Sequence, residues 1–200
     1  LLFFLVWFER LLINAPWWAV LVVVCALVFL VGRSWKIVAG TAVAFLLIGY
    51  FGMWKDTMST MSIITVCTLI AIALGVPIGI VMARSDRART IVTPILDVMQ
   101  TMPAFVYLIP VVMLLGIGKV PGVIAVVIYA IPPVIRLTNL GIRLVDRDVL
   151  EAADAFGASG WQRLVGVQIP LALPTIMAGI NQTIMMALAM VVIASMIGVQ

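Results

Sequence analysis

The sequence contains no histidine, only two cysteines and few charged residues, which make up 10% of its 200 positions. Histidine is the commonest metal ligand and a frequent general base, so its absence removes the usual chemistry of many enzymes and metal centres. Cys25 and Cys67 lie inside different apolar stretches, which argues against a secreted disulfide framework. The sequence also lacks a G-x-x-x-x-G-K-[ST] phosphate loop and any cluster of cysteines or carboxylates. We therefore expect no catalytic residue, no resident cofactor and no metal in this chain.

Apolar residues are abundant instead, at 65% of the chain, and the mean hydropathy is +1.29. Residues 17–31 and 63–83 contain no charge, and each run is about as long as the stretch that crosses a bilayer core. Only helices or closed barrels satisfy the backbone there, and continuous apolar runs do not alternate as barrel strands do. The composition therefore predicts an all-α integral membrane protein.

Six apolar segments are long enough to be interpreted as spans: 16–31, 37–53, 58–83, 91–117, 120–143 and 171–198. Most basic residues lie in the connections after the first, third and fifth segments, namely Arg33, Lys36, Arg84, Arg87, Arg89, Arg143, Arg147 and Arg163. Only Arg10, Lys55 and Lys119 fall on the opposite side. The excess of positive charge predicts that the first group faces the cytoplasm. Because these residues form no continuous patch with aromatics, nucleic-acid binding is not indicated.

The two ends of the sequence carry weaker signals. Leu1 to Trp7 precede Glu9 and Arg10 without a basic leading region or a cleavage site, so we interpret this segment as an interfacial or partial helix. The sequence begins without methionine and stops close to the end of an apolar run. We expect a single membrane domain over residues 1–200 that is truncated at one or both ends.

Prolines interrupt several of the apolar segments, at Pro77, Pro103, Pro110, Pro132 and Pro133. Each removes a backbone donor and crowds the preceding turn, which favours a kink. Breaks at this density suggest a bundle that moves or lines a cavity. The alternative is that proline is simply common in membrane helices.

The connection over residues 146–170 is far longer than the usual link between two helices. Asp148 with Glu151 resembles a capping box, and Gly157 supplies a left-handed position that ends a helix. An apolar face is expected from Leu150, Ala153 and Phe156. Ser159 with Gln162 repeats the box for a second helix, which Pro170 is expected to stop. The pattern predicts a helix, a glycine corner and another helix on the cytoplasmic side, either as a packing lid or as a docking element.

Polar side chains recur within the predicted spans. Asp97 and Gln100 share one helical stripe, and a carboxylate at membrane depth costs roughly 2.5 to 3.5 kcal/mol on insertion scales. The stripe either lines a path or gate near the cytoplasm or belongs to an interfacial helix after Arg89. Candidate residues for a translocation path or gate are Asp97, Gln100, Arg136, Asn139, Asn181 and Gln182. The residues alone leave an Asp97–Arg136 pair open.

The long connection resembles a known motif. Glu151-Ala152-Ala153, then Gly157 and later Val167-Gln168-Ile169-Pro170 resemble the EAA motif of ABC importer permeases, with conservative changes at two positions. Longer runs resemble the glycine betaine/proline betaine branch of that family: 96–107, 116–122, 132–138 and 174–183. We identify the chain as similar to these permeases over most of its length.

This resemblance implies a type I ABC importer transmembrane domain with a cytoplasmic coupling helix, in a multi-pass protein of the bacterial inner membrane. It implies a second copy of the permease, two cytoplasmic ATP-binding subunits that hold ATP and Mg, and an extracytoplasmic substrate-binding protein. The coupling residues would be Glu151, Ala152, Ala153, Gly157, Ile169 and Pro170. The solute would be a quaternary amine, although glycine betaine, proline betaine, choline, carnitine and proline stay open.

Two other classes of function are weighed against this interpretation. A secondary transporter would couple ions to solute through Asp97 and Arg136, but it predicts inverted repeats, which the sequence does not show. A membrane scaffold would explain the hairpin but not the spans broken by proline. A quaternary ammonium solute would also favour an aromatic cage. Phe105, Tyr107 and Tyr129 are too scattered along the sequence to predict one.

Overall fold

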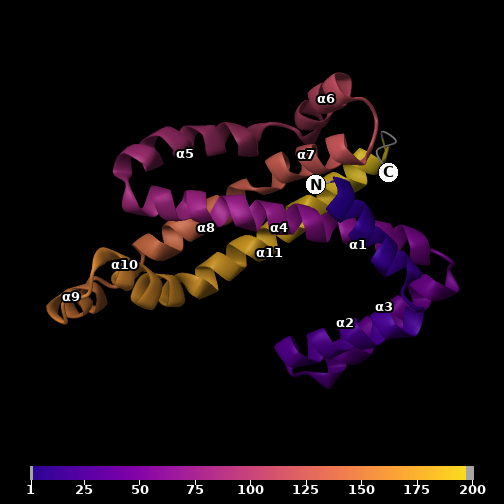
Figure 1. Ribbon diagram of the computed structural model, residues 1–200, viewed down its shortest axis with the longest axis horizontal. Helices are drawn as coiled ribbons and strands as arrows, with labels where there is room; N and C mark the ends of the chain where they lie inside the picture. The colour runs from indigo at the N-terminus through magenta and orange to yellow at the C-terminus, as the bar shows by residue number, and fades with distance from the viewer. Residues whose placement is uncertain (1, 197–200) are drawn as a thin grey trace. The chain divides into compact units, whose positions relative to one another are not determined.

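A computed structural model describes residues 2–196, and all regular structure in that range is helical (Figure 1). The helices divide between two compact units, Leu1–Val66 and Cys67–Gln200, and α4 runs through the boundary. The described residues thus confirm the all-α prediction. The prediction of a single domain over residues 1–200 stays a prediction.

The first unit contains α1 (Leu2–Asn14), α2 (Trp17–Gly32), α3 (Trp35–Tyr50) and the beginning of α4 (Trp54–Arg84). Chain direction changes by 106° between α1 and α2, because Pro16 adopts an extended conformation just before α2. Arg33 has a positive φ of 45° and ends α2, so α3 can fold back against it (Figure 1). α2 and α3 are 16 residues each, or about 24 Å at 1.5 Å per residue. The span expected over 37–53 therefore ends earlier, at Tyr50.

In its described part, the second unit contains the rest of α4 and the helices α5 to α11. These are α5 (Asp86–Thr101), α6 (Ala104–Leu115), α7 (Lys119–Ala130), α8 (Pro132–Arg143), α9 (Arg147–Ala155), α10 (Gly160–Arg163), the π-helical turn η1 (Leu164–Gln168) and α11 (Ile169–Met196). α4, the α7–α8 pair and the stretch from α10 through α11 are each long and apolar enough to cross a membrane. The spans expected over 58–83 and 120–143 are confirmed. The expected end of the last span at residue 198 lies outside the described residues.

Helix α8 packs between α4 and α11 through glycine contacts. A Cβ added at Gly75 would collide with Val134, and one at Gly79 would lie 2.6 Å from the Thr138 Cβ. On the other side, a Cβ at Gly179 would lie 2.9 Å from the Leu137 Cβ. Gly75 and Gly79 form a G-x-x-x-G pattern, which lets two membrane helices approach closely. Glycines on α4 and α11 therefore let these two helices approach α8 closely.

The span expected over 91–117 is wrong as a single helix. α5 and α6 meet at 94° across Met102 and Pro103. Met102 is extended, with ψ of 136°, because a residue before proline avoids the helical region. The hydroxyl of Tyr107 donates to the carbonyl oxygen of Met99 at 2.6 Å, which fixes the corner. Leu96 anchors α5 among Ala71 and Met82 of α4, so α5 folds back along α4 (Figure 1).

The other prolines do not interrupt their segments in the same way. Pro77 lies inside α4 and Pro110 inside α6. Pro132 and Pro133 occupy the first positions of α8, where a missing backbone N–H costs little because the first turn has no intrahelical acceptor for it. α7 and α8 are separated at Ile131, just before Pro132, but they still form one span. Among the five prolines considered, only Pro103 lies at a sharp bend.

Candidate functional site

The hairpin that the sequence predicts over residues 146–170 begins with α9, whose N-cap is Asp146. The Asp146 carboxylate accepts a hydrogen bond from the backbone N–H of Asp148 at 3.0 Å. The expected capping box of Asp148 and Glu151 is therefore wrong, because the helix starts two residues earlier and Asp148 already lies in its first turn. A carboxylate there still interacts favourably with the helix dipole. Glu151 is left exposed, with no hydrogen bond or ion pair among the described contacts.

Gly157 forms the corner that the sequence predicts. Its φ is +76°, and its N–H donates to the carbonyl oxygen of Asp154 at 2.9 Å. Ala158 donates to the carbonyl oxygen of Ala153 at 3.1 Å. These two bonds make up a Schellman motif, which satisfies the last carbonyls of α9 and requires a left-handed residue at the glycine. The chain direction between α9 and α10 is therefore fixed by backbone hydrogen bonds.

The second helix begins with the capping box predicted at Ser159 and Gln162. The Ser159 hydroxyl accepts from the Gln162 N–H at 3.3 Å, and the Gln162 side chain accepts from the Ser159 N–H at 2.8 Å. The prediction that Pro170 stops this helix is wrong. The chain passes through the π-helical turn Leu164–Gln168 into α11, so one helix extends over Gly160–Met196. The wider turn accommodates the proline ring, which would otherwise crowd the carbonyl of the preceding turn.

The hairpin is tied to the ends of two long helices. Leu164 is buried against Ile142 of α8 and against Ala172 and Ile176 of α11. Within the hairpin, Arg163 of α10 pairs with Asp154 of α9 at 2.6 Å. The hairpin is thus joined to the end of α8 by buried side chains and is continuous with α11.

The hairpin exposes two aromatic side chains among polar ones. Phe156 is 93% exposed and Trp161 is 66% exposed. Glu151, Ala152 and Pro170 are also exposed, whereas Ala153 and Ile169 are half-buried. The expected apolar face is therefore partly wrong, because α9 ends at Ala155 and Phe156 points into solvent instead of sharing the half-buried side of Leu150 and Ala153. Exposed aromatic side chains rimmed by polar groups mark an interaction surface.

Two ion pairs connect α5 to α8. Arg136 of α8 pairs with Asp97 of α5, and Arg143 pairs with Asp86 at 2.7 Å. Arg143 also donates to the Met82 carbonyl oxygen at 2.9 Å and to the Asn139 side chain at 3.2 Å. The structure thus brings three predicted path residues, Asp97, Arg136 and Asn139, onto one α5–α8 contact. Gln100 is exposed near the end of α5 and shares no described contact with them.

Asn181 and Gln182 form a separate group in the middle of α11. Both are exposed, and no hydrogen bond to either side chain occurs in the described part of the chain. Gly179, two residues before Asn181, faces α8, so Asn181 projects from roughly the opposite side of the helix. An amide at mid-span that faced lipid would lose its hydrogen bonds at high cost. This face of α11 therefore needs water or a polar protein surface beside it.

The sequence reasoning missed two kinds of residue. Gly75 and Gly79 set the α4–α8 contact, and their G-x-x-x-G spacing was a usable signal. Asp86 was missed as the partner of Arg143, and Ser59 as a donor to the buried carboxylate of Glu9 at 2.9 Å. No spacing in the sequence indicates either of these pairings, since their members lie on different helices.

Comparison with known proteins gives one consistent result. Residues 75–200 match the family described as binding-protein-dependent transport system inner membrane component. The chain is 54% identical over 167 residues to the glycine betaine/carnitine transport permease protein GbuB of Listeria monocytogenes, covering 84% of this chain and 59% of that protein. It is 51% identical over 197 residues to the glycine betaine/proline betaine transport system permease protein ProW of Escherichia coli, covering 96% and 54%. It is 55% identical over 158 residues to the glycine betaine transport system permease protein OpuAB of Bacillus subtilis, covering 79% and 56%. The chain thus spans between half and three fifths of the length of these relatives.

Proposed function

Because the chain belongs to the family of binding-protein-dependent transport system inner membrane components, we propose that it forms the membrane path of an ATP-driven importer for a quaternary amine such as glycine betaine. In this proposal a partner subunit binds ATP and Mg, and an external binding protein delivers the solute. Two copies of the permease enclose the path. All three relatives described above are glycine betaine permeases by name, which supports the choice of solute.

The observation that carries the proposal is the construction of the hairpin. α9 presents exposed Glu151 and Phe156, while the Schellman corner at Gly157 and the α9–α10 ion pair make the hairpin one body. A body that continues into a long apolar helix passes movement from a docked ATPase subunit into the membrane. A flexible loop at the same place would absorb that movement.

The path itself is proposed to run along the exposed face of α11. Asn181 and Gln182 offer hydrogen bonds at mid-span to water, to solute or to the second copy. Given the predicted orientation, the Asp86–Arg143 pair lies at the cytoplasmic ends of α5 and α8, whereas the Asp97–Arg136 pair lies toward their opposite ends. We assign them to the walls of the path, where Asp97 and Arg136 hold α5 in place.

The test uses the full-length permease in proteoliposomes with its ATPase and binding protein, and follows uptake of labelled glycine betaine. Uptake should require ATP, and Gly157→Val should reduce it at least tenfold, because a β-branched residue is strained at positive φ. Gly166→Val is the matched control, since an added Cβ there meets nothing within 4 Å and its φ is ordinary.

Binding and coupling are separated by a second measurement on the same variants. Gly157→Val should still insert in the membrane and bind solute-loaded binding protein, while ATP hydrolysis loses its stimulation by solute. Uptake driven by an ion gradient without the ATPase would refute the importer proposal. It would also make Asp97 and Arg136 candidates for ion coupling.

A further inference from the structure

An aromatic hollow of about 440 Å³ lies among α2, α3 and the first turn of α4, within the first compact unit. Four aromatic side chains line it: Trp17, Phe45, Tyr50 and Trp54. Leu21 and Leu46 add apolar surface. The Phe45 and Trp54 rings meet edge to face, with centroids 6.2 Å apart and planes at 69°. Aromatic side chains from three helices therefore converge where the scattered aromatics of the sequence predict no cage.

The hollow lies at one end of the antiparallel pair formed by α2 and α3. Trp17 begins α2, Tyr50 ends α3 and Trp54 begins α4. Arg33 and Lys36 lie at the opposite end of the same two helices. The excess of basic residues predicts that this opposite end faces the cytoplasm, which assigns the hollow to the external side.

The lining of the hollow suits an organic cation. Ring faces carry negative electrostatic potential, and a quaternary ammonium is attracted to them without needing a hydrogen bond. No lysine or arginine lines the hollow, so no lining side chain repels a positive ligand. Tyr50 is 85% exposed and Trp17 is 57% exposed, which leaves their ring faces available.

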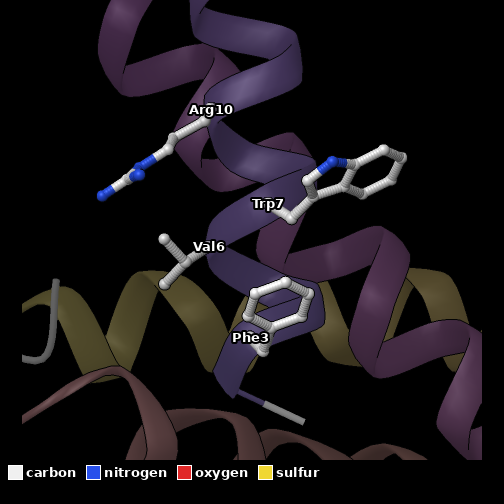
Figure 2. A pocket seen from close by; sticks show the side chains of 4 residues that line it. All are labelled: Phe3, Val6, Trp7 and Arg10. Atoms are coloured by element: carbon white, nitrogen blue, oxygen red, sulfur yellow. The ribbon is translucent and has the colours of Figure 1, made fainter.

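A second hollow, on α1, gives a useful contrast. It has a volume of about 370 Å³ and is lined by one face of the helix, Phe3, Val6, Trp7 and Arg10 (Figure 2). Figure 2 shows the Arg10 guanidinium extending from the same helix as the Trp7 and Phe3 rings. A fixed positive charge at the rim disfavours a cationic ligand. The α1 hollow is therefore not a candidate for the same chemistry, although it also contains aromatic rings.

We propose that the hollow formed by Trp17, Phe45, Tyr50 and Trp54 binds a quaternary ammonium group on the external side of the membrane. The identification of that group as part of the transported solute rests on the proposed function, whereas the aromatic site does not. Gly49 lines the same hollow, and a Cβ added to it meets nothing within 4 Å. The missing side chain at this position keeps the hollow open.

The experiment titrates choline into full-length permease in nanodiscs of phosphatidylglycerol, a lipid without an ammonium group, and measures binding by calorimetry. The neutral isostere 3,3-dimethylbutanol is titrated in parallel. Choline should bind at least fivefold more tightly than the isostere, and Trp54→Leu should weaken choline binding about fivefold or more. Trp35→Leu is the matched control, because Trp35 contacts Phe29 at the opposite end of the α2–α3 pair, with ring centroids 4.8 Å apart and planes at 45°.

A second variant distinguishes a loss of the binding site from a loss of folding. Gly49→Leu removes no ring and fills the hollow, so it should abolish choline binding while the far-ultraviolet circular dichroism and thermal transition stay those of the wild type. Equal binding of choline and the isostere would overturn the proposal. Unchanged choline binding in both Trp54→Leu and Gly49→Leu would also overturn it.

Lipid and solute are separated by repeating the titration in phosphatidylcholine nanodiscs. If lipid headgroups occupy the hollow, the wild-type protein should bind choline more weakly in phosphatidylcholine discs than in phosphatidylglycerol discs. That result would support an ammonium site filled by lipid. Equal affinity in both supports a site for free solute. Uptake assays on the same preparations distinguish the two proposals. Choline binding that depends on Trp54, together with uptake that does not require ATP, would refute the importer and keep the site.

Discussion

Asp97 of α5 and Arg136 of α8, 39 residues apart in sequence, form an ion pair across two helices of the second unit. The pair lies one turn before the Met102–Pro103 break, so it holds the last part of α5 against the central helix. Both side chains are partly exposed, at 56% for Asp97 and 35% for Arg136. The contribution of such a pair to overall stability is about 1 kcal/mol or less. Its role is therefore to position the end of α5 against α8.

Asp97→Asn should therefore lower ATP-driven uptake severalfold while changing the thermal transition by only a few degrees. The exchanged double variant, Asp97→Arg with Arg136→Asp, should recover part of the lost uptake because it restores the pair with reversed charges. Thermal unfolding is measured on the purified protein in detergent, and uptake on the same preparation after reconstitution in proteoliposomes. If the exchanged variant transports no better than Asp97→Asn alone, the pair does not position α5.

Gly75→Val and Gly79→Val should each destabilise the second unit, by about 1 to 3 kcal/mol, because a larger side chain in a closely packed contact forces the helices apart. The collisions would involve Val134 for the first variant and Thr138 for the second. Gly40→Val in α3 is the control, since a Cβ there meets nothing within 4 Å. Thermal unfolding in detergent should show lower transitions for the first two variants only.

Ser159→Ala should loosen the start of α10, at a cost of about 1 kcal/mol, because it removes the acceptor for the Gln162 N–H. Hydrogen exchange of the backbone amides at 160–163 should become faster. Ser34→Ala makes a matched control, because Ser34 occupies the N-cap of α3 without a side-chain cap bond. Equal exchange at 160–163 in Ser159→Ala and wild type would show that the capping box does not order the hairpin.

Asn181→Cys should react with a membrane-permeant, water-dependent thiol reagent in a protein whose native cysteines are replaced. Thr183→Cys should not, since Thr183 is 0% exposed and lies on the buried side of α11. Solute delivered by the binding protein should slow the reaction at position 181. Equal reaction at both positions would contradict a water-lined face beside Asn181.

The sequence predicts the long elements well and their junctions poorly. The apolar runs lead directly to α4, to the α7–α8 span and to α11, because hydropathy alone decides whether a segment enters the bilayer. The Gly157 corner and the Ser159 box were also predictable, since each depends on residues within a few positions of one another. Capping motifs and apolar runs can both be recognised from the sequence alone.

The predictions that were wrong concern positions where neighbouring residues favour different helix ends, or where residues far apart in the sequence come together. Asp146 and Asp148 are both good caps, and only the backbone conformation decides that Asp146 is used. Pro103 breaks its segment whereas Pro77 does not, because Met102 is extended and the Tyr107–Met99 bond holds the corner. Pro170 would stop a regular helix, but a π-helical turn precedes it. The aromatic hollow was not predicted because its side chains come from three helices separated by up to 37 positions.

The unbroken helix from Gly160 to Met196 also joins the hairpin to the membrane without a flexible link. Its 37 residues extend about 55 Å at 1.5 Å per residue. The helix contacts α8 near its start, through Leu164 and Ile142, and further along, through Ala172, Thr175 and Gly179. In the proposed importer, a push on the hairpin would therefore tilt α8 and α11 as one unit, so that a change at one membrane face reaches the other without a separate step.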